Sequence, residues 1–180
     1  MEQFWIFGYG SLMWRPGFDY LRSEPALVHG YHRSLCVYSF VHRGTPEEPG
    51  LVLGLDRGGS CHGMGFEVAP EKWQETVAYL RAREQVTAVY IEKRKIIRLL
   101  GSGRQVEAVT YVVDRAHHQY AGVLGLDDLL AHVRRGRGVS GHCIDYVMNT
   151  VAHLREMKIR DPRLERLVAG LAPQAASSSS

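Results

Sequence analysis

The sequence predicts an α+β fold, a small curled mixed β-sheet or barrel with helices beside it. About six short segments have the apolar or alternating pattern of strands, most helical patterns come later, and glycine and proline separate the segments. The chain has 180 residues, of which 45% are hydrophobic and 23% charged, and these values suit a folded domain. We therefore expect a single domain over 1–170 and a disordered serine-rich tail over 171–180.

The strands are predicted where apolar runs or alternation meet turn residues. The first is the run from Phe4 to Phe7, which stops at Gly8. The others are segments rich in β-branched and aromatic residues, or alternating with small ones: 26–40 (one or two strands), 51–55, 63–68, 88–99 and 106–114. A loop is expected over 42–50, a turn over 56–59, and a hairpin around 101–103.

Four helices are predicted from their start and stop signals. The first begins at Pro70, a favourable first helical residue. The second covers 126–135, with Gly136 in a C-cap position. The third begins near Ser140, its expected N-cap, and a short fourth helix follows Pro162.

One carboxylate interrupts an apolar stripe on the first predicted helix. Trp73, Val77 and Leu80 follow one another by four and three residues, and the next step of four reaches Glu84. Burial raises the pKa of a carboxyl, which prepares it to act as a general base or acid. Glu84 is therefore a candidate catalytic residue. The alternative is that the helix ends near Ala82 and Glu84 pairs with a neighbouring arginine at the surface.

A glycine-rich turn follows the first strand. Its two glycines allow a sharp turn that exposes successive N–H groups, which can bind an anion or a developing oxyanion. The third glycine of a dinucleotide-binding fingerprint is missing, and Pro16 and Gly17 oppose a long helix after the turn. The alternative is a tight turn with no other role. The candidate binding residues are Gly8, Tyr9, Gly10, Ser11 and Leu12.

The third predicted helix has an apolar stripe, Ile144, Val147, Val151 and Leu154, and a second stripe beside it. The second stripe consists of His142, Tyr146, Asn149 and His153, and it either lines a pocket or faces solvent. His142 and His153 would lie about 16 Å apart at roughly 1.5 Å per residue, too far to share a metal ion. We therefore expect no metal site.

Composition argues against several function classes. Lys and Arg number 22 and Asp and Glu 19, and the net charge of +3 is spread along the chain, so nucleic-acid binding is not expected. Three widely spaced cysteines, Cys36, Cys61 and Cys143, argue against a disulfide framework. Apolar runs fall short of the roughly 20 residues of a membrane span, and the N-terminus lacks a secretory signal pattern. We expect a cytoplasmic protein.

Taken together, these motifs resemble the ChaC type of γ-glutamylcyclotransferase. FGYGSLMWRP at 7–16 resembles the family's substrate-binding signature, and YLRAREQVTAVY at 79–90 resembles its catalytic glutamate motif, with the glutamate at Glu84. The likeness covers roughly residues 4 to 155. Ala88 and Val89 stand where members often carry two glycines, and Cys143 stands where Asn is frequent. The residues that match the family's G-x-S-G…Y…N motif are Gly138, Ser140, Gly141, Tyr146 and Asn149.

The resemblance implies an enzyme that cleaves glutathione to 5-oxoproline and cysteinylglycine without a cofactor. Glu84 would be its general base and acid. The turn residues, to which the resemblance adds Met13, would bind the substrate together with Tyr146. Expected partners are a small γ-glutamyl substrate but no nucleic acid or membrane, and the chain would be a monomer or weak dimer. Two alternatives stay open: an enzyme of the same fold that acts on another γ-glutamylamine, and a non-catalytic γ-glutamyl-binding module.

Overall fold

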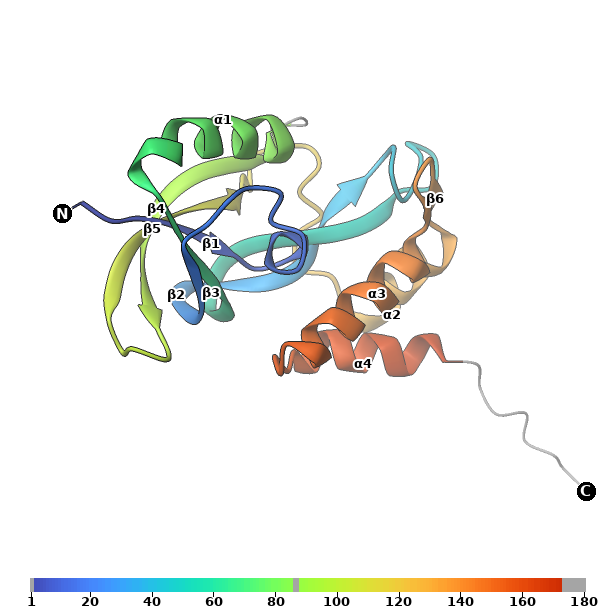
Figure 1. The fold of residues 1–180 in the computed structure, drawn as a ribbon. Coiled ribbons are helices and arrows are strands. Elements are labelled where there is room, and N and C mark those ends of the chain that lie inside the picture. Colours follow the sequence, from blue (N-terminus) through green and yellow to red (C-terminus); the bar gives the residue numbers. More distant parts are fainter. Residues whose placement is uncertain (1, 86–87, 173–180) are drawn as a thin grey trace, which may run out of the picture. The chain divides into compact units, whose positions relative to one another are not determined.

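The computed structural model describes residues 2–85 and 88–172, and the chain forms two compact units (Figure 1). Unit 1 comprises Met1–Tyr38 and Leu53–Val123, and unit 2 comprises Ser39–Val52 and Leu124–Ser180. The predicted α+β class is confirmed. The single domain over 1–170 stays a prediction. Residue 171 still belongs to a helix, and 173–180 of the predicted tail lie outside the described residues.

Unit 1 is built on a closed barrel with the strand order β1-β3-β2-β4-β5. Strand β1 pairs antiparallel with β3 and parallel with β5, and this parallel pair closes the barrel. Strands β4 and β5 form the predicted hairpin. The closed mixed sheet confirms the predicted curled sheet or barrel. The strands are β1 (Phe4–Gly8), β2 (Arg22–Ser39), β3 (Gly50–Val68), β4 (Tyr90–Leu99) and β5 (Gln105–Val113).

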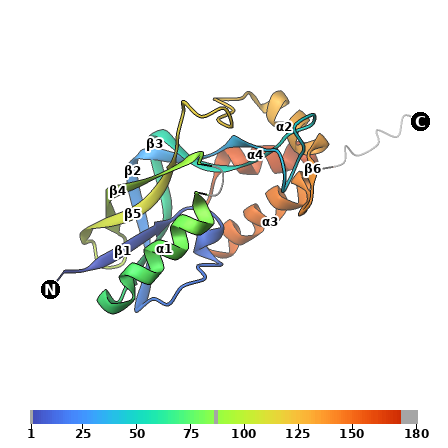
Figure 2. The same ribbon diagram turned by 90° about the horizontal axis from the view of Figure 1, so that it is seen from above.

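Strand alternation gives the barrel wall two apolar faces. Trp5 and Phe7 belong to the barrel's inner cluster, whereas Ile6 between them joins a second cluster on the outer face. Helix α1 (Trp73–Glu84) packs against that outer face through Leu80, which is fully buried, and its first residue stacks on Phe4 with ring centroids 4.9 Å apart. Figure 2 shows α1 lying along the barrel strands. The apolar stripe therefore anchors this helix, as predicted.

The predicted turn over 56–59 is wrong, because β3 runs without a break from Gly50 to Val68. Asp56 is buried, and its carboxylate accepts hydrogen bonds from Arg115 Nε and Tyr120 Oη, both at 2.8 Å. Gly58 and Gly59 adopt φ of +103° and +68° within the strand. Turn-forming residues thus bend a continuous strand here, since Asp56 finds its partners on another segment.

Unit 2 is a bundle of three helices that pack pairwise: α2 (Leu126–Arg135), α3 (Cys143–Glu156) and α4 (Pro162–Leu171) (Figure 1). A small two-stranded sheet, β6 (Arg137–Gly138) and β7 (Gly141–His142), precedes α3. In the expected apolar stripe of α3, Val147, Val151 and Leu154 are buried and Ile144 is half-buried.

Of the two predicted caps in unit 2, one is wrong and one is confirmed. Helix α3 begins at Cys143 rather than near Ser140, whose hydroxyl lies 2.9 Å from His42 Nδ1 instead of capping the helix. Gly136 is the C-cap residue of α2, as predicted, and its φ of −63° lies outside the left-handed region. A Cβ at Gly136 would lie 2.6 Å from the carbonyl oxygen of Arg43, so close packing explains this glycine. Within the described ranges, no helix is long and apolar enough to cross a membrane.

Candidate functional site

Glu84 is the last residue of α1, in unit 1. Pro70 begins a 3-10 turn that leads into the helix, as its sequence predicts, and the helix continues past Ala82. The helix thus ends two residues beyond Ala82, while Glu84 does pair with Arg83, as the alternative expected. The Glu84 side chain is only 22% exposed, so the stripe carries the carboxylate into a largely shielded position.

The electrostatic surroundings of Glu84 favour its neutral form. Burial raises the pKa of Glu84 above its ordinary value, and the positive charge of Arg83 opposes this shift. Arg83 Nε lies 3.6 Å from Glu84 Oε1. A carboxylate with a raised pKa and limited access to water has the properties of a general base or acid.

The glycine-rich turn follows β1 and leads into a 3-10 helix, Ser11–Met13. Its backbone closes through a hydrogen bond from Met13 N–H to the Gly10 carbonyl, 2.9 Å long. Leu12 and Met13 are buried, whereas Ser11 is exposed. Gly10 has φ of −132°, so this glycine does not require the left-handed region. The first N–H groups of such a turn have no partner within it and are available to a ligand.

Arg83 links the glutamate to the turn region. Its guanidinium donates to Ser11 Oγ at 3.1 Å and to the carbonyl oxygens of Arg15 and Pro16 at 2.6 and 3.1 Å. The same guanidinium lies beside Glu84. The structure therefore brings Glu84 and the turn into one region of unit 1. Ser11 and Arg83, whose hydrogen bond connects them, are 72 residues apart in the sequence.

Sequence reasoning missed the buried Arg33. It is 6% exposed, and it donates to the carbonyl oxygens of Tyr9 and His62, both at 2.6 Å, which fixes the start of the turn. A cation in the alternating pattern of β2, between Tyr31 and Leu35, is the same kind of signal that singled out Glu84. The same reasoning could have found it.

Tyr111 on β5 was also missed, and it had no sequence signal. It is buried, and its hydroxyl donates to Glu92 Oε2 at 3.0 Å. Burial raises the pKa of Tyr111, as does the hydrogen bond to Glu92, and the charge of Glu84 adds to the effect. Tyr111 therefore lies within electrostatic range of Glu84. The sequence does not single it out, because an aromatic residue is ordinary in an apolar strand.

Ala88, one of the two residues that replace the glycine pair frequent in the family, has a strained backbone conformation. Ala88 has φ of +57°, in the left-handed region that favours glycine. A left-handed conformation costs roughly 1–2 kcal/mol for a residue with a Cβ. The glycines that members often carry here thus fit the backbone that this segment adopts before Tyr90.

Tyr146, the last predicted binding residue, belongs to unit 2, whereas Glu84 and the turn belong to unit 1. It lies on α3 and is half-buried, and the Arg43 guanidinium carbon lies 5.7 Å from its ring centroid. On the same stripe His142 and Asn149 are exposed and His153 is half-buried. A role for Tyr146 in substrate binding stays a prediction.

Cys143 occupies the position at which Asn is frequent in the family. Its thiol donates to the Leu51 carbonyl at 3.2 Å and accepts from the Leu51 N–H at 3.4 Å. An Asn side chain also has one donor group and one acceptor, so both residue types satisfy the same backbone. Among the described residues, no group of three or more His, Cys, Asp or Glu side chains could hold a metal ion.

Comparison with known proteins gives consistent matches. A family model described as "ChaC-like protein" matches residues 4–173. The glutathione-specific gamma-glutamylcyclotransferase 1 of Danio rerio is 32% identical over 172 residues, which covers 93% of this chain and 88% of the relative. The glutathione-specific gamma-glutamylcyclotransferase of Escherichia coli is 28% identical, with 93% and 72% covered.

A solved structure supports the fold. The γ-glutamylcyclotransferase specific to glutathione from yeast superposes with a TM-score of 0.81 at 23% identity, covering 94% of this chain and 95% of the yeast chain. At this identity the superposition shows a shared fold. Because the family model spans almost the whole described chain, and the Danio rerio relative is 32% identical over most of both lengths, the chain belongs to the ChaC-like protein family.

Proposed function

We propose that this chain is a glutathione-specific γ-glutamylcyclotransferase, with Glu84 as its general base and acid. The observation that carries the proposal is a largely shielded glutamate at the end of α1, tied by Arg83 to the glycine-rich turn. Membership of the ChaC-like family, with relatives named for this activity, supports the substrate.

The reaction is an intramolecular cyclisation. The α-amine nitrogen of the γ-glutamyl group attacks its own γ-carbonyl carbon, a C–N bond forms, and the amide bond to the cysteine nitrogen breaks. Glu84 takes a proton from the attacking amine and returns one to the leaving nitrogen, so no water is consumed. Such base catalysis is typically worth about 10²–10⁴-fold.

The turn would hold the substrate for this attack. The backbone N–H groups around Gly10 and Ser11 are suited to a carboxylate or to the developing oxyanion, and the loss of one such donor typically costs roughly 2.7–4 kcal/mol. The remaining binding residues proposed are Gly8, Tyr9, Leu12, Met13 and Tyr146. Folding the substrate into a near-attack conformation is then the main task of the enzyme.

The decisive experiment supplies glutathione to chelator-treated protein in ¹⁸O-labelled water and analyses the products by mass spectrometry. We expect equimolar 5-oxoproline and cysteinylglycine, with no ¹⁸O in either. Labelled free glutamate would mean hydrolysis instead of cyclisation and would contradict the proposal.

The same assay with another γ-glutamylamine addresses the alternatives. Turnover of that amine by folded protein that leaves glutathione intact would favour a different substrate. Binding without turnover of either compound would favour the non-catalytic module. We further propose that the protein is cytoplasmic and acts as a monomer or weak dimer. Sedimentation tests the oligomeric state.

A further inference from the structure

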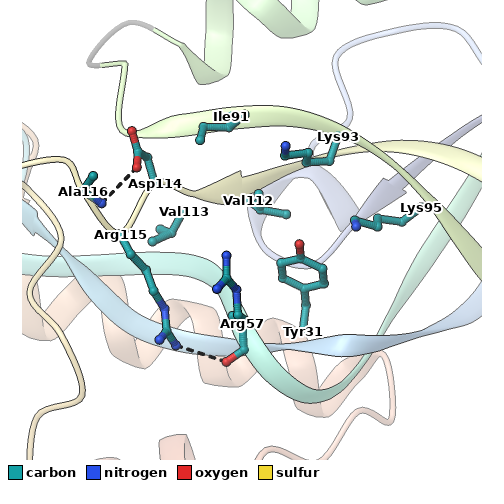
Figure 3. Close-up of a pocket in the computed structure, with 10 residues that line it drawn as sticks. All are labelled: Tyr31, Arg57, Ile91, Lys93, Lys95, Val112, Val113, Asp114, Arg115 and Ala116. Atoms are coloured by element: carbon teal, nitrogen blue, oxygen red, sulfur yellow. Dashed lines mark hydrogen bonds between the residues drawn. The ribbon is translucent and has the colours of Figure 1, made fainter.

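A cavity of about 370 Å³ lies on the other face of strand β4 from helix α1 (Figure 3). On β4, Glu92 reaches Arg81 of α1 through two hydrogen bonds of 2.8 and 2.9 Å. Its neighbour Lys93 and the next alternate residue, Lys95, therefore point to the opposite face. Both lysines line the cavity, and Glu84 and the residues of the glycine-rich turn are not among its lining.

The cavity concentrates positive charge. Four of its ten lining residues are cations, Arg57, Lys93, Lys95 and Arg115, and Asp114 is its single acidic residue. Figure 3 shows Arg57 extending from β3 towards the strand pair β4–β5, into the space that the lysines border. Lys93 and Lys95 are two residues apart on one face of a strand, roughly 7 Å at about 3.4 Å per residue, and like charges so placed repel each other.

Other side chains of the protein neutralise little of this positive charge. Arg115 is paired, since its Nε donates to Asp56 and its NH2 group to the Arg57 carbonyl. Within the part of the chain that the structure describes, the side chains of Lys93 and Arg57 have no hydrogen bond or ion pair, and Lys95 has only the Tyr31 ring, 5.1 Å from its ammonium nitrogen. Three cations thus border one space, where Asp114 is the one carboxylate and, among the described residues, forms no ion pair with any of them.

The walls of the cavity indicate the kind of anion that fits. Ile91, Val112 and Val113 form an apolar side, which suits an organic portion. A guanidinium fork and two ammonium groups suit phosphate, which carries up to two charges and three acceptor oxygens. The volume matches that of typical small-molecule sites, about 300–1,000 Å³.

We propose that this cavity is a binding site for a small organic phosphate carrying at least two negative charges, separate from the Glu84 site. Arg57, Lys93 and Lys95 hold the phosphate groups, and the apolar wall receives the organic part. The assignment rests on the cavity and its unpaired cations, and it stands whether or not glutathione is the substrate.

Calorimetric titration with pyrophosphate and ADP, at constant ionic strength, tests this site. We expect one pyrophosphate ion to bind per chain, and we expect ADP to bind more tightly than pyrophosphate. The double variant Lys93→Gln/Lys95→Gln should lose affinity by at least about 100-fold, from roughly ten-fold or more per charge-assisted hydrogen bond. The matched control is Arg98→Gln, which removes one charge from the opposite face of the same strand and should change affinity less than two-fold.

Three outcomes would overturn the proposal. The first is no binding of either phosphate at millimolar concentration, and the second is an equal loss in the control variant. The third is competition between pyrophosphate and saturating glutathione in Glu84→Gln protein, because competition would merge the cavity with the substrate site. Circular dichroism of each variant verifies that the barrel is folded.

Discussion

Glu84 is a carboxylate held where a helix would otherwise present an apolar residue to the barrel. Trp73 and Leu80, which precede it on the stripe, lie against the outer face of the barrel, and burial raises the pKa of Glu84. This position could be predicted from periodicity alone, because a charged residue on a core-facing stripe stands out. Arg33 could have been found by the same reasoning, whereas Tyr111 could not, since an aromatic residue is ordinary in a strand.

Replacing Glu84 by Gln should reduce turnover of glutathione by at least about 100-fold, the usual worth of a general base. Glutathione should still bind, because the amide keeps the size of the side chain. Rates of 5-oxoproline release and a calorimetric Kd measure the two effects. Glu75→Gln, on the same helix and 75% exposed, is the matched control and should keep full activity. Near-normal turnover of the Glu84 variant would eliminate the mechanism.

The same substitution should stabilise the protein at neutral pH. The pKa of Glu84 is raised in the folded state, so its contribution to stability is fully present below the unfolded pKa, about 4.3, and is lost as the pH rises through the folded pKa. Glu84→Gln should therefore be more stable than the parent at pH 7.5, and this difference should shrink towards pH 4. Urea unfolding at both pH values measures it. A variant that is less stable at pH 7.5 would show that the attraction of Arg83 outweighs burial.

At the scale of elements, the glycine-rich turn can be tested separately from the fold. A Cβ at Gly10 would lie 3.5 Å from Leu53 Cδ1, an ordinary contact. Gly10→Ala should therefore leave the free energy of unfolding within about 0.5 kcal/mol of the parent. If the substrate lies against this backbone, affinity for glutathione should fall at least about ten-fold. Unchanged affinity would mean that the turn is only structural.

Gly17 provides the contrasting control for this measurement. It has φ of +74°, and a Cβ there would lie 2.1 Å from the Tyr79 hydroxyl. Gly17→Ala should therefore lose roughly 1–2 kcal/mol of stability, the cost of a left-handed residue, because the exposed Tyr79 ring can move away from the added methyl group. The two variants separate a loss of binding from a loss of fold.

Arg83 connects α1 to the loop after β1, and its charge acts on Glu84. Arg83→Gln should lower turnover roughly 10- to 100-fold, because a misplaced catalytic group can cost about 100-fold. Loss of the positive charge should also raise the pKa of Glu84 further, which moves the acid limb of the kcat profile to higher pH. Arg83→Lys should restore the limb. An unmoved limb in Arg83→Gln would limit Arg83 to a structural role.

Most elements could be predicted from the sequence, and the exceptions have local causes. The hairpin of β4 and β5, the start of α1 at a proline, and α2 all follow patterns of short range. Strand β3 was predicted as two strands because Asp56 and two glycines look like a turn. Arg115 and Tyr120, the hydrogen-bond partners of Asp56, are about 60 residues away in the sequence, so no local pattern indicates them.

At the scale of the whole molecule, the three cysteines are free and buried. Burial raises the pKa of Cys36 to about 12, with the charge of Asp56 adding to it, and burial also raises the pKa of Cys143. The native protein should therefore react with a thiol reagent at pH 8 far more slowly than unfolded chain does, by at least about 100-fold, since the thiolate is the reacting form. Labelling kinetics followed by mass spectrometry, with and without denaturant, measure this. Rapid native labelling of Cys36 would contradict the burial of this strand.

The division into two units was not expected from the sequence. Residues 39–52, which comprise the end of β2, the start of β3 and the segment between them, belong to unit 2 with the C-terminal helices. The composition of this segment resembles that of an ordinary loop, with two prolines and few apolar residues. Only long-range packing, such as the bonds between Leu51 and Cys143, distinguishes it from one.

The parallel pairing of β1 with β5 has a consequence for the birth of the protein on the ribosome. Trp5 pairs with Ala108, so β1 waits for a partner that is synthesised about 100 residues later. At about 5–20 residues per second, this wait is roughly 5–20 s. Throughout it the edge of β1 stays open, and the glycine-rich turn that follows it has no closed barrel to support it. The part of the chain proposed to recognise the substrate is thus translated well before the strand that completes its surroundings.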